Sequence, residues 1–227
     1  MKAYLELSEI ELMEQVASYQ RDQLLIRLLS RLGCRVSEAL ALKLDDIDFE
    51  QHTITILHLK RSVKLSCPMC KSRLGNRHQY CPVCGHKVDE TIRSQQERRR
   101  TRVLPVDEST LAMLKSYMGT LLSGGEESPL FHLSRHRAWQ IVRDCAKRAG
   151  LPSLVNPETG RIMGISPHRL RDAFSVHAMK VDDSGDGLRL LQEHLGHVSF
   201  NTTARYRKIA GEEHRQWYDR LWHKRPC

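Results

Sequence analysis

Two CxxC pairs constrain this chain more than any other feature of its sequence. They are Cys67-Pro-Met-Cys70 and Cys81-Pro-Val-Cys84, and ten residues separate them. Each pair can place two thiolates on one tetrahedral ion from a tight turn, and Gly85 supplies the open backbone that such a turn needs. Four protein ligands close the coordination sphere of the ion. The sequence therefore predicts a zinc ribbon with one structural Zn²⁺ bound by Cys67, Cys70, Cys81 and Cys84.

Two disulfides are the alternative use of these four cysteines. Disulfides persist in oxidising compartments. The sequence has neither the charged-then-apolar start of a signal peptide nor an apolar run near the ~20 residues of a membrane span. We therefore expect a cytoplasmic protein with no membrane partner, and we favour the metal over the disulfides. Cys34, Cys145 and Cys227 are expected to be unpaired.

The positive charge of the chain is concentrated around the four cysteines. Residues 60–102 carry twelve basic side chains against three acidic ones, and this net charge of +9 equals that of all 227 residues. The segment stays strongly basic even with four thiolates on one dication. Such a surface favours a polyanionic partner, and we expect contacts with the phosphates of double-stranded DNA. The alternative is a ribbon that only stabilises a long insertion.

The chain before and around this segment combines helices with one pair of strands. A capping box at residues 8–11 and a leucine stripe that stops at Gly33 predict two helices, and Ser37 is expected to cap a third. Alternating side chains predict strands over residues 52–60 and 100–106. These strands would pair as a hairpin with the metal segment inserted at its tip.

Helices are also expected after the hairpin. Asp107, Ser134 and Ser166 stand at helix starts, and Pro167 follows the last of these at the first helical position. Beyond a turn-rich segment at residues 156–164, the periodicity predicts helices near 188–195, 201–208 and 212–223. With 40% hydrophobic residues, the chain can build one large or two small domains with a real core.

Four short motifs occur in order along the chain. They are Gly33-Cys34-Arg35-Val36-Ser37-Glu38-Ala39-Leu40, His168-Arg169-Leu170-Arg171, Leu195-Gly196-His197, and Tyr206 nine residues later. Together they resemble the catalytic domain of the tyrosine recombinases, the phage integrase family, over most of residues 5–215. The resemblance implies an α+β fold that is mainly helical, with a small antiparallel sheet and the zinc ribbon inserted in a hairpin.

The same resemblance implies a domain organisation. Residues 1–60 and 99–227 would form the catalytic domain, and residues 61–98 would form the inserted zinc ribbon. We expect no N-terminal core-binding domain, the DNA-clamping unit of this family, ahead of residue 5. Either the chain is a trimmed piece of a longer protein, or it is a minimal recombinase in which the basic ribbon supplies part of the grip on DNA.

The resemblance also implies roles for six residues. Arg35 and Arg171 would bind the phosphate under attack, which gathers negative charge that paired guanidiniums stabilise. Tyr206 would be the nucleophile and form a 3′-phosphotyrosyl link. Lys60, or Lys64 in its place, would protonate the departing 5′-oxygen. His168 would move the tyrosine proton, and His197 would hydrogen-bond the phosphate or orient its neighbours. No catalytic metal or nucleotide is implied.

Two departures from the family pattern and one assembly role are also predicted. Asp172 stands where the family usually has histidine, and we expect it to orient Arg171 or partly neutralise it. Residues 182–187 are expected to lengthen a loop. The aromatic stripe of the last helix would either pack on its own domain or dock on a neighbouring subunit, and the resemblance implies a homo-oligomer, a tetramer on DNA, held by this helix.

Two other functions compete with recombination. One is a non-catalytic zinc-ribbon regulator, because residues 191–205 have the helix, glycine turn, helix outline of a DNA-binding motif. The other is a nicking-closing enzyme of the type IB topoisomerase kind, which shares the covalent chemistry without exchange of partners. The regulator leaves Arg35 and the His168-to-Arg171 motif unexplained.

Overall fold

A computed structural model describes residues 2–57, 65–75, 78–88, 101–121, 128–156, 159–182, 184–197 and 203. The elements are α1 (Leu7–Gln15), α2 (Gln20–Arg31), α3 (Val36–Leu40), the 3₁₀ helix η1 (Leu44–Asp46), β1 (Ile47–Asp48), β2 (Thr53–Leu57), β3 (Leu65–Ser66), β4 (Arg73–Leu74), β5 (Thr101–Pro105), α5 (Glu108–Met118), α6 (Arg135–Arg148), β6 (Leu154–Val155), β7 (Ile162–Met163), α7 (Pro167–Val181) and α8 (Gly185–Leu195). The predicted α+β fold, mainly helical with small antiparallel sheets, is confirmed.

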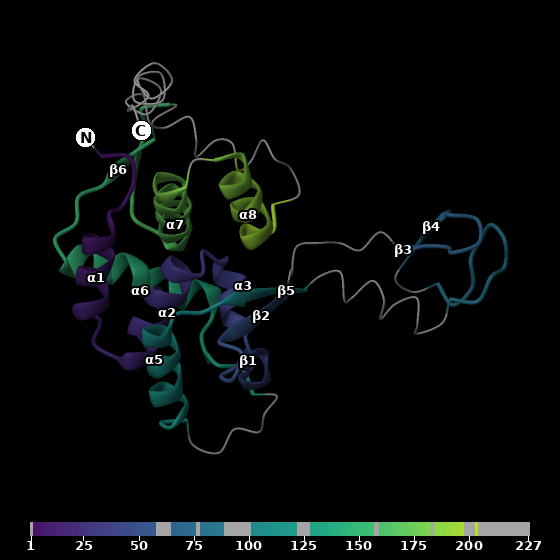
Figure 1. Cartoon of the computed structure of the whole chain (residues 1–227), viewed down its shortest axis with the longest axis horizontal. Coiled ribbons are helices and arrows are strands. Elements are labelled where there is room, and N and C mark those ends of the chain that lie inside the picture. The colour runs from purple at the N-terminus through teal and green to yellow at the C-terminus, as the bar shows by residue number, and fades with distance from the viewer. Residues whose placement is uncertain are drawn as a thin grey trace, which may run out of the picture.

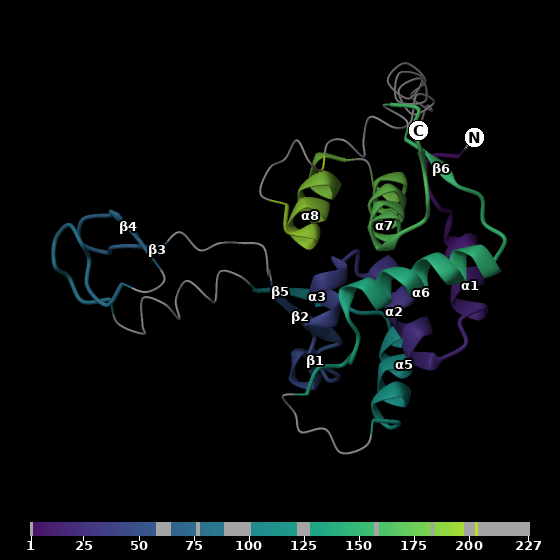
Figure 2. The same ribbon diagram turned by 180° about the vertical axis from the view of Figure 1, so that it is seen from behind.

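The helices surround one large buried core. Figure 1 shows α7 and α8 above the part of the body that contains α2, α3 and the sheet, and Figure 2 shows the same arrangement from behind. Helix α2 is central, and four of its leucines, Leu24, Leu25, Leu28 and Leu29, are fully buried. Within the residues that the structure describes, no helix is both long and apolar enough to cross a membrane.

Two helices in the N-terminal part begin earlier than predicted from the serines at positions 8 and 37. Helix α1 follows Glu6, whose N–H donates to the Glu9 carboxylate at 2.8 Å, and not Ser8. Helix α3 follows Arg35, whose N–H donates to the Glu38 carboxylate at 2.9 Å, and not Ser37. In both cases a glutamate three residues on reaches back to the first residue, so the cap comes from its carboxylate.

The central sheet has the order β1-β2-β5 and is antiparallel. The register of β2 and β5 runs from Thr53 opposite Pro105 to Leu57 opposite Thr101. Ile54 and Ile56 on β2 are fully buried, as the alternating pattern predicts. The predicted strand pair is confirmed, whereas β1 as a third strand was not predicted. The ends of the predicted strand at His58 and Lys60 lie outside the described residues.

Residues 65–75 and 78–88 form a small unit of their own. Strands β3 and β4 pair in it, and a further bridge joins Tyr80 to Lys87. Its buried side chains, Cys67, Leu74, Cys81 and Val88, make a cluster that is separate from the large core. Figure 1 shows this unit in blue, with β3 and β4 labelled. The domain limits predicted at residues 60/61 and 98/99 fall outside the described residues and stay predictions.

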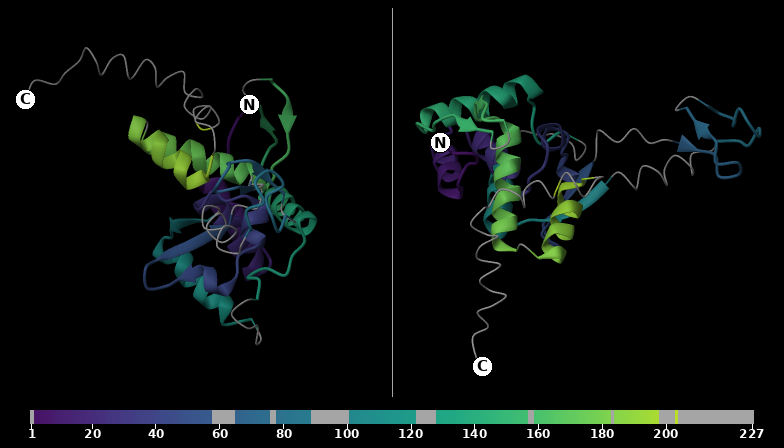
Figure 3. Two further views of the ribbon diagram at one scale, coloured as in Figure 1. Left: turned by 90° about the vertical axis from the view of Figure 1, so that its right-hand side faces the viewer. Right: turned by 90° about the horizontal axis from the view of Figure 1, so that it is seen from above.

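Helices α7 and α8 lie side by side (Figure 3). Helix α7 begins after Ser166 with Pro167 in its first turn, as predicted. Helix α8 begins at Gly185, because the Ser184 hydroxyl accepts from the Gly187 N–H at 2.9 Å, so half of the loop expected at residues 182–187 is helical. The turn-rich segment before α7 includes β7, which pairs with β6 as a short antiparallel hairpin.

Candidate functional site

Arg171 is the buried cation around which the site is built. It lies on α7 with 2% of its surface exposed. Its Nη1 donates to the carbonyl oxygen of Gly33, and its Nη2 donates to the carbonyl oxygen of Leu195 at 2.9 Å. Gly33 follows α2 and Leu195 ends α8, so one guanidinium joins three helices. A charge buried this deeply is tolerated only with such partners.

Gly33 permits the close approach of α7 to the end of α2. Its φ is +56°, in the left-handed region that favours glycine. A Cβ at this position would meet the Phe174 ring on α7 at 2.5 Å. The stop signal read at Gly33 is therefore also a packing requirement, and it places Arg35 two residues beyond the carbonyl that Arg171 binds.

Arg35 shares a buried carboxylate with a second arginine. Its Nη1 donates to Oε1 of Glu38 at 2.8 Å, and Nη2 of Arg102 on β5 donates to Oε2 at 2.9 Å. Burial opposes ionisation of Glu38, but the hydrogen bonds and charge of Arg102, together with the Arg35 N–H, outweigh it and lower its pKa to about 2. Glu38 is therefore an anion that holds the Arg35 guanidinium, which remains 31% exposed.

His197 completes the cluster from the residues after α8. Its Nε2 accepts from Nη2 of Arg171 at 2.9 Å, and its Nδ1 lies 2.9 Å from Oγ1 of Thr203. Burial, followed by the charges of Arg171 and Arg35, lowers the pKa of His197 to about 4. The imidazole is therefore uncharged at neutral pH, and the charges of Arg171, Arg35 and Arg102 all act on it.

His168 lies one turn before Arg171 on α7, with 66% of its side chain exposed. Asp172 is buried, and its Oδ2 accepts from Nη1 of Arg169 at 2.7 Å while its Oδ1 lies 4.0 Å from Nε2 of His168. The acid at this position thus holds Arg169 and stands beside His168. The expectation that it orients Arg171 or partly neutralises it stays a prediction.

The structure brings two of the six predicted catalytic residues, Arg171 and His197, into direct contact. A third, Arg35, lies two residues beyond the Gly33 carbonyl that Arg171 binds, and its charge helps to lower the pKa of His197. His168 is on the same helix as Arg171 and faces solvent. Lys60, its alternative Lys64, and Tyr206 lie outside the described residues. Their predicted roles stay predictions.

Glu38, Arg102 and Thr203 take part in these contacts although no role was predicted for them. The spacing of three residues between Arg35 and Glu38 is the signal of a capping carboxylate, and it was available. No local pattern pairs Arg102 with a residue 64 positions earlier. Thr203 sits in an ordinary helical pattern, and its contact with His197 depends on how α8 ends.

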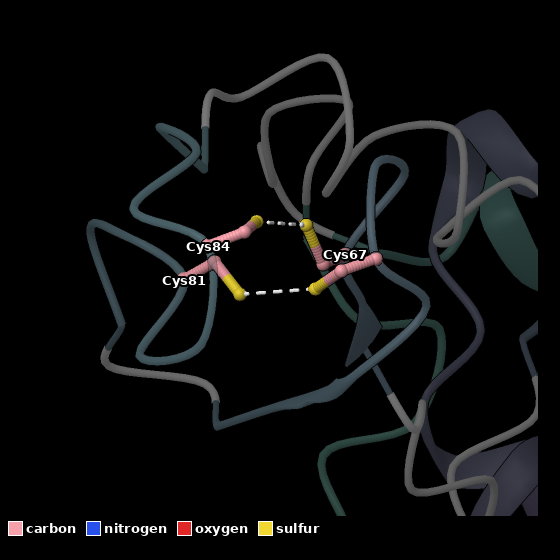
Figure 4. Close-up of side chains that lie close together, drawn as sticks. Cys67, Cys81 and Cys84 are labelled. Carbon is pink, nitrogen blue, oxygen red and sulfur yellow. Dashed lines mark hydrogen bonds between the residues drawn. The ribbon is translucent and has the colours of Figure 1, made fainter.

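The four cysteines predicted as metal ligands lie together (Figure 4). All four Sγ atoms are within 4.8 Å of one another, and the pairs Cys67–Cys84 and Cys70–Cys81 are each 3.5 Å apart. A tetrahedral ion with Zn–S bonds of about 2.3 Å sets its sulfurs about 3.8 Å apart. A disulfide requires about 2.05 Å. The arrangement therefore suits one metal ion held by four thiolates and contradicts the two-disulfide alternative.

The two cysteine pairs adopt the same turn. In the first, the Lys71 N–H donates to the carbonyl of Cys67 at 2.9 Å, and in the second the Gly85 N–H donates to the carbonyl of Cys81 at 2.9 Å. Lys71 and Gly85 both have positive φ, +57° and +73°. The backbone of each pair is thus shaped to direct two sulfurs inward, and Lys71 accepts a conformation in which glycine is the usual residue.

The fold agrees with solved structures of recombinases. The crystal structure of XerA recombinase matches with a TM-score of 0.64 and 19% identity, covering 100% of this chain and 67% of that chain. The structure of XerH site-specific recombinase bound to difH substrate matches with a TM-score of 0.56 and 22% identity, covering 96% and 54%. The fold is that of a tyrosine-recombinase catalytic domain.

The sequence comparisons give the family. The model of the phage integrase family matches residues 4–213, and the chain belongs to this family. Tyrosine recombinase XerD of Mycobacterium tuberculosis is 30% identical over 186 residues, which cover 82% of this chain and 47% of that protein. Tyrosine recombinase XerA of Pyrococcus horikoshii is 25% identical over 208 residues, which cover 92% and 57%. The chain spans about half the length of the curated relatives it matches.

Proposed function

We propose that this protein cuts and rejoins DNA strands at specific sites, as a recombinase or integrase, through a 3′-phosphotyrosyl intermediate. The observation that carries the proposal is the convergence of Arg171, Arg35 and His197 at the ends of α2, α7 and α8. Two guanidiniums that are held rigidly by protein acceptors can stabilise the extra negative charge of a phosphorus atom under attack.

The chemical steps follow from the residues assigned to them. The phenol oxygen of Tyr206 attacks phosphorus and gives its proton to His168, while Arg35 and Arg171 hold the phosphate oxygens. The P–O bond to the 5′-oxygen breaks, and that oxygen takes a proton from Lys60. The new phosphotyrosyl ester has nearly the energy of the bond that broke, so a 5′-hydroxyl can reverse the step without a nucleotide.

Glu38 and Arg102 contribute to this chemistry by fixing Arg35. The carboxylate of Glu38 fixes the plane of the Arg35 guanidinium, and without a counterion it would repel a DNA phosphate. Arg102 supplies that counterion from β5 at 2.9 Å. The group of Arg35, Arg102, Arg171 and Glu38 therefore carries a formal charge of +2, which favours binding of an anion.

Double-stranded DNA is the partner that this charge favours. Helix α6 adds an exposed cationic and aromatic face, in which the Arg143 guanidinium lies over the Trp139 ring at 4.8 Å and His136 stacks with the same ring. Assembly into a tetramer through the last helix also belongs to the proposal, although that helix lies outside the described residues. The cytoplasmic location stays a prediction.

Zinc is the metal that the four-cysteine cluster suits best, because four thiolates with tetrahedral spacing are a structural zinc set. The ion would hold the two turns of the ribbon together and take no part in the cleavage chemistry. The described part of the ribbon contains Lys71, Arg73 and Lys87 and no acidic residue. We propose that the ribbon adds sequence-independent contacts to DNA phosphates.

A suicide DNA substrate tests the proposed activity. A nick placed near the cleavage site traps the covalent intermediate, so the wild type should give an SDS-resistant protein–DNA adduct in the absence of Mg²⁺. Tyr206→Phe should give none, whereas Tyr19→Phe, which alters an exposed tyrosine beside α2, should give as much as the wild type.

The same experiment separates the competing functions. A regulator binds the DNA and forms no adduct. If the wild type gives this result with a DNA site of validated sequence, the enzymatic proposal is refuted. A nicking-closing enzyme forms the adduct and relaxes supercoiled DNA without joining two different duplexes. Recombinant product from two labelled substrates is the result expected here.

A further inference from the structure

Ser72 lies between the two cysteine turns of the ribbon. Its hydroxyl oxygen is 3.0 Å from Sγ of Cys70, in its own turn, and 3.1 Å from Sγ of Cys81, in the other turn. These two sulfurs are 3.5 Å from each other. One side-chain oxygen therefore contacts a sulfur from each half of the four-cysteine cluster.

The backbone fixes the position of this hydroxyl. The carbonyl oxygen of Ser72 accepts a hydrogen bond from the Cys67 N–H at 2.9 Å, and the next residue, Arg73, pairs with Ser66 where β4 meets β3. Only one side-chain torsion separates the serine backbone from its oxygen, and that torsion has three staggered positions. The contact with the two sulfurs is therefore built into the turn.

The chemistry of the cysteines determines the direction of the hydrogen bond. Cysteine binds a metal ion as the thiolate, which has no proton and can only accept. The Ser72 hydroxyl is then the donor, and it acts beside the Val83 N–H, which donates to Sγ of Cys81 at 3.4 Å. Four thiolates on one dication carry a formal charge of −2, and hydrogen bonds to the sulfurs stabilise that charge.

We propose that Ser72 is a further residue of the metal site, whose hydroxyl donates to the thiolates of Cys70 and Cys81 and strengthens the binding of the ion. The proposal rests on the zinc site proposed above. Ser72 stands two residues after the second cysteine of its pair, and His86 has the equivalent place in the other pair. The two halves of the site therefore differ, because the hydroxyl comes from the first turn.

Competition with a chromophoric chelator measures the affinity of the full chain for Zn²⁺. Loss of a partner that hydrogen-bonds a metal ligand typically weakens metal binding 10–100-fold, so Ser72→Ala should bind Zn²⁺ at least about tenfold more weakly than the wild type. Ser72→Thr retains the hydroxyl and should stay within about threefold of the wild type. Ser66→Ala makes the same change at an exposed serine of the ribbon and should bind as the wild type does.

Co²⁺ in place of Zn²⁺ supplies a spectrum that separates the hydrogen bond from the stability of the ribbon. The d–d bands report tetrahedral binding by four thiolates and should be the same in Ser72→Ala and the wild type. The thiolate-to-cobalt charge-transfer band should move to longer wavelength in Ser72→Ala, because a thiolate that loses a hydrogen bond gives up an electron more easily.

Two results overturn the proposal. One is wild-type affinity in Ser72→Ala, and the other is weaker binding without a shift of the charge-transfer band, which would mean that only the stability of the ribbon had changed. If the wild type binds neither Zn²⁺ nor Co²⁺, the proposed zinc site is refuted together with the role of Ser72. The adduct assay decides separately whether the protein cleaves DNA.

Discussion

Glu38→Gln tests whether the carboxylate between Arg35 and Arg102 stabilises the fold as its environment implies. The pKa of Glu38 is lowered from 4.5 to about 2 although burial acts in the opposite direction. At about 1.4 kcal/mol per pH unit, the ionised carboxylate contributes roughly 3 kcal/mol to stability at pH 7. The amide retains the size of the side chain and loses the charge, so it leaves two guanidiniums facing one neutral group.

Urea denaturation at pH 7 measures this loss. We expect Glu38→Gln to lower the free energy of unfolding by about 3 kcal/mol, in the range found when one partner of a buried ion pair is removed. Glu11→Gln is the matched control, because Glu11 is 54% exposed and lies 3.8 Å from Arg31, so its loss should cost less than about 1 kcal/mol.

The dependence on pH sharpens the same experiment. A carboxyl whose pKa is lower in the folded chain stabilises the fold fully above its unfolded pKa of 4.5, and this contribution is lost as the pH falls toward 2. The difference between the wild type and Glu38→Gln should therefore narrow between pH 5 and pH 3. If the two variants, Glu38→Gln and Glu11→Gln, lose equal stability at pH 7, the reasoning about the buried carboxylate is wrong.

Three further predictions follow from the described contacts. Gly33→Ala should destabilise the fold by more than about 2 kcal/mol, because it adds a clash to left-handed strain, whereas Gly150→Ala has space around its Cβ and should cost about 1 kcal/mol in thermal melts. The pKa of His197, about 4, lies below that of the unfolded chain, so its contribution to stability is complete above about pH 6.5 and is lost as the pH falls; NMR titration should show no ionisation of this ring near pH 6.5. Metal analysis should find about one zinc per chain. Changing both Cys67 and Cys81 to serine should remove the zinc and weaken DNA binding, with a smaller salt dependence, while residual cleavage persists; unchanged affinity would contradict the proposed ribbon–DNA contact.

Features with local signals were predicted correctly. The cysteine spacing indicated four sulfurs around one point, and they lie within 4.8 Å of one another. The Ser166-Pro167 pair indicated the start of α7, and alternation indicated the pairing of β2 with β5. In each case the side chains responsible are close in sequence or repeat with the period of one element.

Features that depend on distant segments were not predicted. The partnership of Glu38 with Arg102 forms only because α3 packs near β5, which lies beyond the metal segment. Residues 182–187 were expected to lengthen a loop, yet the Ser184 cap starts α8 at Gly185 despite the low helix propensity of glycine. The contacts of Asp172 with Arg169 and His168, its neighbours on the same helix, were not predicted either.

Arg171 donates hydrogen bonds to the main-chain carbonyls of Gly33 and Leu195, and this affects how the kinetics of Arg171 variants are interpreted. Because the Arg171 guanidinium binds the carbonyls at the ends of α2 and α8, replacing Arg171 should weaken both the fold and the proposed phosphate site. A lower reaction rate in such a variant would have two causes that the rate alone does not separate. One is displacement of the helices, and the other is loss of positive charge beside the reacting phosphorus. Arg35 is partly exposed and pairs with Glu38, a carboxylate that Arg102 also holds, so replacing Arg35 should disturb the fold less than replacing Arg171.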